Sequence, residues 1–173
     1  MKLYHTGKEE IRQPDLDHGR KNADFGPGFY LTPDKDFAFR WAGKGAVINE
    51  YEFDEEGLTA KTFERDLSWF NYIFANRKGK DLEEADYVKG PIANDTIYDT
   101  LGVLTSGLLS SEEALKILLI GPCYIQVAIK SQKALSKLKW LKSEEIKDHG
   151  KYAVLLKEEQ ERYQNTLAEA ISD

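Results

Sequence analysis

All eight phenylalanines of this 173-residue chain lie between Phe25 and Phe74, and two of its three tryptophans lie in the same stretch. Aromatic side chains bury large apolar areas, so this clustering constrains where a core can form. The chain is long enough for one domain, or two small ones, with a real hydrophobic core. We therefore predict a globular protein whose core is built largely by residues 25–74.

Composition excludes several classes of protein. The single cysteine, Cys123, can form neither an internal disulfide nor a cysteine-based zinc site. No run approaches the roughly 18 apolar residues of a membrane span, and the polar N-terminus lacks the apolar core of a signal peptide. We expect a cytoplasmic protein with no membrane partner. The net charge of −6 excludes a globally basic nucleic-acid-binding surface, although a local one stays open.

Hydrophobic periodicity and turn signals predict a mixed α+β domain. Residues 8–25 are predicted to form a surface loop, and no element is assigned to residues 141–146. Strands are expected at residues 2–5, 29–32, 46–53, 87–88 and 124–129. Helices are expected at 33–42, 66–77 and 131–138, after a cap at Asn94, after a capping box at Ser110 and Glu113, and over most of 151–173.

Three motifs look like known functional signatures but lack their context. Asp24-Phe25-Gly26 spells the metal-binding triplet of kinases, but the chain is too short for a kinase and has no glycine-rich loop followed by a strand lysine. Gly43-Lys44-Gly45 lacks the upstream spacing of a phosphate-binding loop. His5, His18 and His149 have no i, i+3 or i, i+4 pairing, so we expect no metal site.

Three other local patterns follow one another along the chain. The first is a histidine at the end of the first strand, in Tyr4-His5-Thr6-Gly7. The second is a turn that leads into an aromatic strand, Asp24-Phe25-Gly26-Pro27-Gly28-Phe29-Tyr30-Leu31-Thr32. The third is Gln126 on the late strand 124–129. Taken one at a time, such residues are more often structural than functional, and it is their ordered combination that carries weight.

In that combination the chain resembles the ADP-ribosyltransferase superfamily, in the branch of diphtheria toxin and the poly(ADP-ribose) polymerases, which uses a histidine, a tyrosine and a glutamate on three strands. It is more similar still to an uncharacterised bacterial family of this fold, whose members often lie beside small antitoxin-like genes. The residues that carry this closer resemblance are Leu3 to Thr6, Pro14-Asp15, Arg20, Asp24 to Thr32, Arg40-Trp41-Ala42, Asn76-Arg77, Gly90 to Asp95, Gln126 and Lys133-Ala134-Leu135.

The resemblance implies an α+β fold with an ADP-ribosyltransferase-like split β-sheet core, inserted central helices and a C-terminal helix. Residues 1–146 would form this domain, and residues 147–173 would form a C-terminal helical extension packed on it. The implied activity is NAD-dependent mono-ADP-ribosyl transfer with release of nicotinamide, in a bacterial toxin or a phage-defence effector. The implied partners are NAD, a protein or nucleic-acid acceptor, and a small antitoxin protein.

The resemblance also implies roles for single residues. His5 would bind a ribose hydroxyl, and the backbone of Thr6 would pair with the carboxamide. Tyr30 would stack on the nicotinamide, with Trp41 as a second stacking aromatic, and Arg20 is a candidate for the pyrophosphate. The two turn glycines would let the backbone approach the ligand closely. The implied catalytic residues are His5, Tyr30 and Gln126, and the implied NAD contacts are His5, Thr6, Gly7, Arg20, Phe25, Gly26, Gly28, Phe29, Tyr30, Trp41 and Asp95.

Two departures from the family pattern affect the expected chemistry. Thr6 stands where a glycine usually follows the histidine, and its β-branched side chain would narrow the carboxamide slot. Gln126 stands in place of the usual glutamate, and a neutral amide can neither offset cationic charge nor act as a good general base. We therefore favour single transfer over chain elongation. Asp95 is either the missing carboxylate or a residue that starts a helix beside Asn94.

Two further functions stay open on the same residues. One is an NAD glycohydrolase, and the other is a degenerate module that binds NAD or ADP-ribose, which Thr6 and Gln126 would suit. A lysine-rich stretch is either an exposed face or a phosphate-contacting edge for a nucleic-acid acceptor. Its members are Lys130, Lys133, Lys137, Lys139 and Lys142.

Overall fold

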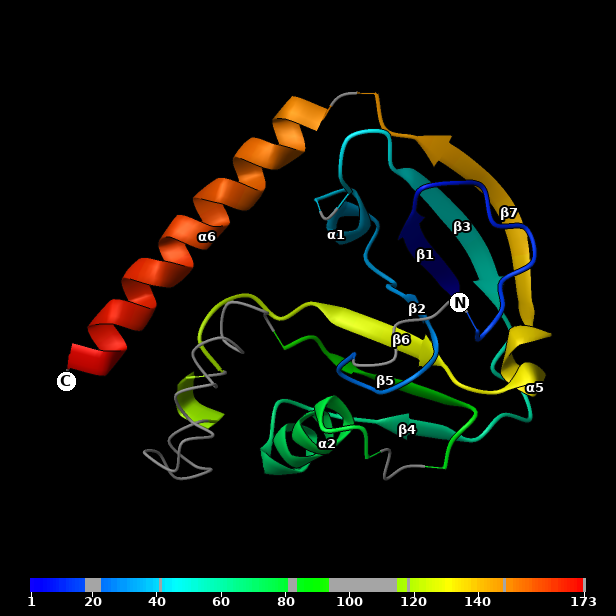
Figure 1. The fold of residues 1–173 in the computed structure, drawn as a ribbon, viewed down its shortest axis with the longest axis horizontal. Helices are drawn as coiled ribbons and strands as arrows, with labels where there is room; N and C mark the ends of the chain where they lie inside the picture. Colours follow the sequence, from blue (N-terminus) through cyan, green and yellow to red (C-terminus); the bar gives the residue numbers. More distant parts are fainter. Residues whose placement is uncertain are drawn as a thin grey trace.

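The computed structural model of this chain describes residues 1–17, 23–40, 42–80, 84–93, 115–117, 119–147 and 149–172. Two β-sheets and their helices give a mixed α+β fold, which confirms the predicted class (Figure 1). The first sheet has the order β1-β3-β7 and comprises β1 (Lys2–Gly7), β3 (Val47–Phe53) and β7 (Leu138–Glu145). The second has the order β2-β6-β5-β4 and comprises β2 (Phe29–Leu31), β6 (Ile125–Ile129), β5 (Tyr87–Pro91) and β4 (Ala60–Thr62).

The described helices begin at side-chain caps where the sequence supplies them. The Asp66 carboxylate accepts a hydrogen bond from the Trp69 amide at 2.9 Å, and the Ser131 hydroxyl accepts one from the Ala134 amide at 3.0 Å. The helix expected after Asn94 lies outside the described residues, as does the start of the one expected after Ser110. The named helices are α1 (Lys35–Arg40), α2 (Leu67–Arg77), α5 (Gln132–Leu135) and α6 (His149–Ser172).

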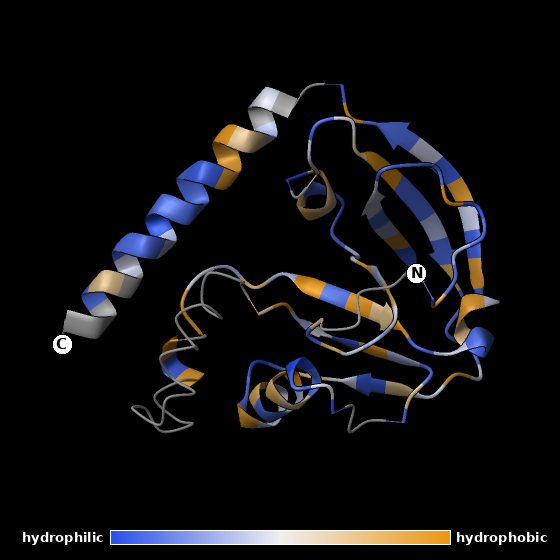
Figure 2. Ribbon diagram, in the orientation of Figure 1, coloured by the Kyte–Doolittle hydropathy of each residue, from blue (hydrophilic) through white to orange (hydrophobic). Residues whose placement is uncertain are grey.

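Four strands differ from the sequence expectation, and the first is β1, which runs to Gly7 instead of ending at His5. β7 occupies the unassigned residues 141–146 almost entirely and also takes Leu138, so the predicted helix 131–138 is shorter than expected. β4 has no counterpart among the predicted strands, and β5 runs to Pro91 instead of ending at residue 88. β4 and β7 lie at sheet edges with exposed or half-buried side chains, so they carry no apolar alternation to reveal them. In Figure 2 the central strand β6 is mainly hydrophobic, whereas the edge strand β7 is mainly hydrophilic.

The aromatic stretch does supply much of the core. Seven of the eight phenylalanines are buried, and Phe74 is half-buried. The core is nevertheless wider than residues 25–74, because Leu3, Val127 and Ile129 join Phe29 in a cluster that lies between the two sheets. Residues 8–25 are not simply a surface loop either, since Asp24 is 4% exposed and Phe25 is fully buried.

The C-terminal helix α6 lies on one flank of the molecule, beside α1 (Figure 1). The Tyr152 ring packs on Phe39 with 5.5 Å between centroids, and Tyr163 is buried in the cluster around Phe25. The Glu159 carboxylate accepts a hydrogen bond from the Arg40 guanidinium at 2.8 Å. Within the described part of the chain, no helix combines the length and the apolar character needed to cross a membrane.

Candidate functional site

The two sheets meet through their edge strands, β1 and β2. Tyr4 and Thr32 exchange two backbone hydrogen bonds of 2.8 Å, which form an isolated antiparallel bridge between the sheets. Beyond this bridge the two strands separate. The edges of two sheets therefore face each other over a short distance without a continuous ladder, and backbone N–H and C=O groups of an edge are open to another partner.

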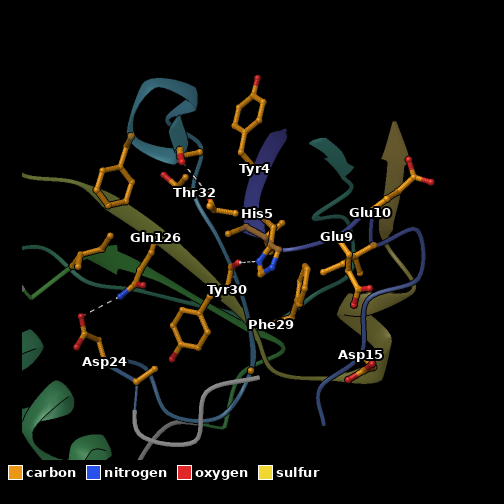
Figure 3. Close-up of a pocket in the computed structure, with 18 of the residues that line it drawn as sticks. Tyr4, His5, Glu9, Glu10, Asp15, Asp24, Phe29, Tyr30, Thr32 and Gln126 are labelled. Atoms are coloured by element: carbon orange, nitrogen blue, oxygen red, sulfur yellow. Dashed lines mark hydrogen bonds between the residues drawn. The ribbon is translucent and has the colours of Figure 1, made fainter. Parts of the chain in front are cut away.

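A pocket of about 750 Å³ opens at this separation (Figure 3). Its volume falls in the range of small-molecule sites, roughly 300–1,000 Å³. Its wall combines β1, β2, the first turn of α1, β6 and the segment from Glu9 to Asp15. Residues spread from Tyr4 to Gln126 along the chain therefore converge on one cavity, and they include the predicted residues His5, Tyr30 and Gln126.

His5 is held by the neighbouring edge strand. Its Nδ1 lies 2.7 Å from the carbonyl oxygen of Tyr30, and its ring stacks on Phe29 with 4.5 Å between centroids. Because a carbonyl can only accept, Nδ1 carries the proton and Nε2 is left as an acceptor. Burial lowers the pKa of His5 below its ordinary value, and the hydrogen bond to Tyr30 opposes this shift in part. The pocket therefore contains a neutral imidazole.

Tyr30 is fixed at the far end of its ring. Its hydroxyl donates to the carbonyl of Gly26 at 2.5 Å and accepts from the amide of Phe25 at 3.0 Å. Gly26 has a φ of +75°, a conformation that favours glycine. The turn before β2 thus clamps the tyrosine hydroxyl, and the ring lines the pocket in one orientation.

Gln126 is held by an ion pair in which the Asp24 carboxylate is buried and the Arg77 guanidinium is half-buried. Its Nε2 donates to Oδ2 of Asp24 at 3.2 Å (Figure 3). Oδ1 of the same carboxylate accepts from Nε of Arg77 at 2.9 Å and from its Nη2, and Oδ2 accepts from the amide of Ala93 at 2.9 Å. Asp24, Arg77 and Gln126 all line the pocket. This network joins β6 to the last turn of α2.

The remaining predicted NAD contacts divide into three groups. Thr6, Gly28 and Phe29 line the pocket. Phe25 does not, because its ring lies in the core against Phe63 and Tyr72. Gly7 and Gly26 are also not among the lining residues. The predicted contacts that lie outside the described residues are Arg20, Trp41 and Asp95.

Two lining residues also have structural roles within the fold, and their expected backbone contacts to a ligand stay predictions. A Cβ at Gly28 would lie 2.6 Å from the carbonyl oxygen of Ile129. Gly28 is therefore required by the close approach of β6, whatever the pocket holds. The Thr6 hydroxyl donates to the carbonyl of Ala38 at 2.8 Å, so this side chain is turned toward α1 and ties it to β1.

The segment around Glu9 is a wall of the pocket that sequence reasoning assigns to a surface loop. Asn49, fully buried in β3, donates to the Glu9 carbonyl at 3.0 Å and accepts from the Ile11 amide at 2.8 Å and from the Ser143 hydroxyl at 2.7 Å. The Tyr51 hydroxyl donates to the Ile11 carbonyl at 2.6 Å, and burial raises the pKa of Tyr51 well above its ordinary value. Both residues clamp the segment to the first sheet.

Asp24 and Arg77 are site residues that the sequence reasoning did not assign. The signals were present, because Asp24 opens the turn motif and Arg77 ends a strongly aromatic helix. Their contact spans 53 residues and depends on how α2 packs on the second sheet, which no local pattern reports. In the described residues, no group of three His, Cys, Asp or Glu side chains lies close enough to hold a metal ion.

The lysine-rich stretch is largely used within the fold. Lys137 pairs with Asp54 at 2.8 Å and Lys142 with Glu50 at 3.6 Å. Lys130 donates to the Phe25 carbonyl at 2.7 Å, and Lys133 donates to the Gly57 carbonyl and lies 3.6 Å from the Asp86 carboxylate. These contacts favour a structural role over a phosphate-binding edge.

The chain belongs to a family described as "Protein of unknown function (DUF3990)", whose model matches residues 1–140. The match contains His5, Tyr30, Gln126 and the Asp24–Arg77 pair, and it ends before α6. No curated protein and no solved structure matches the chain. The site and the family match thus occupy the same part of the sequence.

Proposed function

We propose that this chain is an NAD-dependent mono-ADP-ribosyltransferase whose pocket between β1 and β2 binds the nicotinamide riboside. The observation that carries the proposal is a convergence. His5, Tyr30 and Gln126 stand far apart in the sequence, come from three strands, and line one cavity where two sheets separate. The ADP-ribosyltransferase resemblance implies a histidine, a tyrosine and a glutamate in this order, and here Gln126 stands in place of the glutamate.

The reaction breaks the bond between C1′ of the ribose and the nicotinamide nitrogen. Nicotinamide leaves with the bonding electron pair, and the ribose passes through an oxocarbenium-like state, as in glycoside hydrolysis. A lone pair of the acceptor then forms the new bond to C1′, and the acceptor releases its proton to solvent. The pocket has to orient the ribose and hold the leaving group flat.

The described side chains suit these tasks. Nε2 of His5 can accept a hydrogen bond from a ribose hydroxyl because Nδ1 carries the proton. The clamped ring of Tyr30 can stack on the nicotinamide, which is worth about 1–3 kcal/mol by analogy with base stacking. Gln126 can accept from a second hydroxyl through its amide oxygen. None of these groups needs to rearrange when the ligand arrives, which lowers the entropic cost of binding.

Single transfer to a macromolecule fits this site better than chain elongation. The amide of Gln126 is no general base, so the acceptor has to be a good nucleophile by itself. The acceptor is a protein or a nucleic acid, and the setting that goes with the bacterial resemblance is a toxin or phage-defence effector controlled by a small antitoxin protein.

The test is incubation of the purified protein with NAD, labelled on its adenylate, and a bacterial lysate. We expect label on a macromolecule, and its loss on treatment with either protease or nuclease identifies the acceptor class. His5→Asn is the matched control and should abolish the label. Free ADP-ribose in amounts equal to the NAD consumed would select a glycohydrolase instead. NAD binding without turnover would select a binding module.

A further inference from the structure

The contact between Asp24 and Gln126 gives Asp24 a role in the site that the proposed function does not include. Asp24 is 4% exposed and accepts from Arg77, from the Ala93 amide and from Gln126. A carboxylate in such surroundings is ionised, because every group that faces it in these contacts is a donor. Its placement next to a pocket residue therefore has electrostatic consequences for that residue.

The first consequence is the orientation of the Gln126 amide. An ionised carboxylate can only accept, so the amide group that faces Asp24 has to be the NH₂. Oε1 is then on the other side of the amide, and within the described part of the chain it has no hydrogen-bond partner. Figure 3 shows the amide of Gln126 between Asp24 and the pocket. Asp24 thus determines that the pocket meets an acceptor oxygen here.

The second consequence concerns charge. A carboxylate at position 126 would lie about 3 Å from the Asp24 carboxylate, where two negative charges cannot both remain ionised without a large penalty. Among the described residues, the guanidinium of Arg77 is the cation paired with Asp24, and it can offset one negative charge. A neutral side chain at position 126 is therefore favoured as long as position 24 is charged.

We infer that Asp24 is a positioning residue of the site: it holds the Gln126 amide with Oε1 toward a ligand hydroxyl and favours a neutral side chain at position 126. The identity of that ligand, the ribose of NAD, rests on the proposed function. The Asp24–Gln126 pair carries one negative charge in total, and exchanging the two side-chain types keeps that total. Exchanging the two side-chain types should then be tolerated better than changing position 126 by itself.

The experiment compares Gln126→Glu, Asp24→Asn and the exchanged double variant Asp24→Asn/Gln126→Glu in the full chain. Nicotinamide release, NAD affinity and the midpoint of thermal unfolding are measured for each. Gln132→Glu is the matched control, since it makes the same change at an exposed position of α5 away from the pocket. We expect Gln126→Glu to lose at least about 100-fold in nicotinamide release, the scale of one misplaced group in a site. The double variant should regain at least about tenfold of that loss, a non-additivity typical of residues in one network.

The outcomes separate this inference from the proposed function. Activity that persists or rises in Gln126→Glu overturns the inference, and so does a double variant no better than Gln126→Glu. If the wild-type protein neither binds nor cleaves NAD, the proposed function is wrong. The pairing of Asp24 with Gln126 is then tested by the unfolding midpoints alone. A midpoint that falls in Gln126→Glu and returns in the double variant supports the pairing for another ligand, and additive midpoints overturn it.

Discussion

The two ends of the pocket are built by different means. At one end, His5 is bonded to the backbone carbonyl of Tyr30 and stacked on Phe29, so its contacts are uncharged and belong to the junction of the two sheets. At the other end, Gln126 is bonded to Asp24, which is paired with Arg77 on α2. The first end is assembled by strands that lie side by side, and the second by an ion pair whose carboxylate is buried.

Because of this difference, we expect substitutions at the two ends of the pocket to have different effects. A buried ion pair is costly to break, because the charge left behind is neither solvated nor paired. An uncharged contact to a backbone carbonyl can be replaced by another donor with little loss of stability. We therefore expect variants at the Gln126 end mainly to lower the free energy of unfolding. Variants at the His5 end should mainly reduce ligand binding and turnover.

The largest expected effect on stability is that of Arg77→Met. It leaves the Asp24 carboxylate buried without its guanidinium and should lower the free energy of unfolding by about 3–5 kcal/mol, measured by urea denaturation. Adding Asp24→Asn removes the stranded charge, so the double variant should be more stable than Arg77→Met. A loss below about 1 kcal/mol, the level of an exposed pair, would break the comparison.

His5→Asn should have the largest effect on activity with little effect on stability. The asparagine amide can still donate to the Tyr30 carbonyl, but the acceptor Nε2 is gone. We expect nicotinamide release to fall by about 10²–10³-fold, the usual effect of removing one hydrogen bond made in a transition state. His5→Ala also removes the hydrogen bond to the Tyr30 carbonyl and should lose a further 1–3 kcal/mol or so of stability. Equal unfolding midpoints for both variants would contradict this assignment.

Tyr30→Phe should distinguish the contribution of the hydroxyl hydrogen bonds from that of the aromatic ring. It keeps the aromatic face and removes both hydrogen bonds to the turn, which should cost about 1–3 kcal/mol of stability. Tyr30→Leu loses the ring as well. Calorimetric titration with NAD should show a clearly weaker affinity for Tyr30→Leu than for Tyr30→Phe, and the reverse order would mean that the hydroxyl, not the ring, contacts the ligand.

The pH dependence should follow His5. Its pKa in the folded protein lies below 6.5, so Nε2 accepts at neutral pH and NAD affinity falls when the pH drops through that lowered pKa. The free energy of unfolding should change with pH in the same direction as the NAD affinity. Below pH 6.5 the unfolded chain takes up a proton before the folded chain does, so the free energy of unfolding decreases as the pH falls. His5→Asn should lose both dependences, and an unchanged profile would exclude His5 as their source.

The smallest effect is expected for Glu159→Gln. Its carboxylate pairs with Arg40 at 2.8 Å, but the two side chains are 18% and 30% exposed, which weakens the pair through solvent screening. Thermal unfolding should show a loss of less than about 1 kcal/mol. The Glu159 carboxylate also accepts from the Tyr124 hydroxyl, which can still donate to the amide oxygen of the variant. Compared with Arg77→Met, this variant gives the effect of a charge pair in which neither group is fully buried.

Sequence patterns predict the local features of the site and miss its long-range contacts, for a physical reason. The histidine in β1, the turn glycine Gly26 and the aromatic strand β2 are local features of the sequence. The contacts that the sequence misses are long-range at both ends of the pocket. The Asp24–Arg77 contact beside Gln126 joins residues 53 positions apart, and the clamp of Asn49 on Glu9, on the His5 side, joins residues 40 positions apart. Such contacts depend on how helices and sheets pack on one another, so hydrophobic periodicity in the sequence does not predict them.

The same reason explains which elements were found. β3 and β6 carry buried β-branched and aromatic residues, and both are predicted within one residue of their ends. β4 and β7 lie at edges with polar side chains and escape the pattern. The roles expected for Arg20, Trp41 and Asp95 remain predictions, because these residues lie outside the described part of the chain.

The most direct test of the central claim is a crystal structure of the full chain with NAD or a non-hydrolysable NAD analogue. The account predicts the nicotinamide riboside between β1 and β2, with Nε2 of His5 within hydrogen-bond distance of one ribose hydroxyl and Oε1 of Gln126 on another. The nicotinamide ring should lie against Tyr30. A ligand bound at another surface, or an empty pocket at millimolar NAD, would contradict the account.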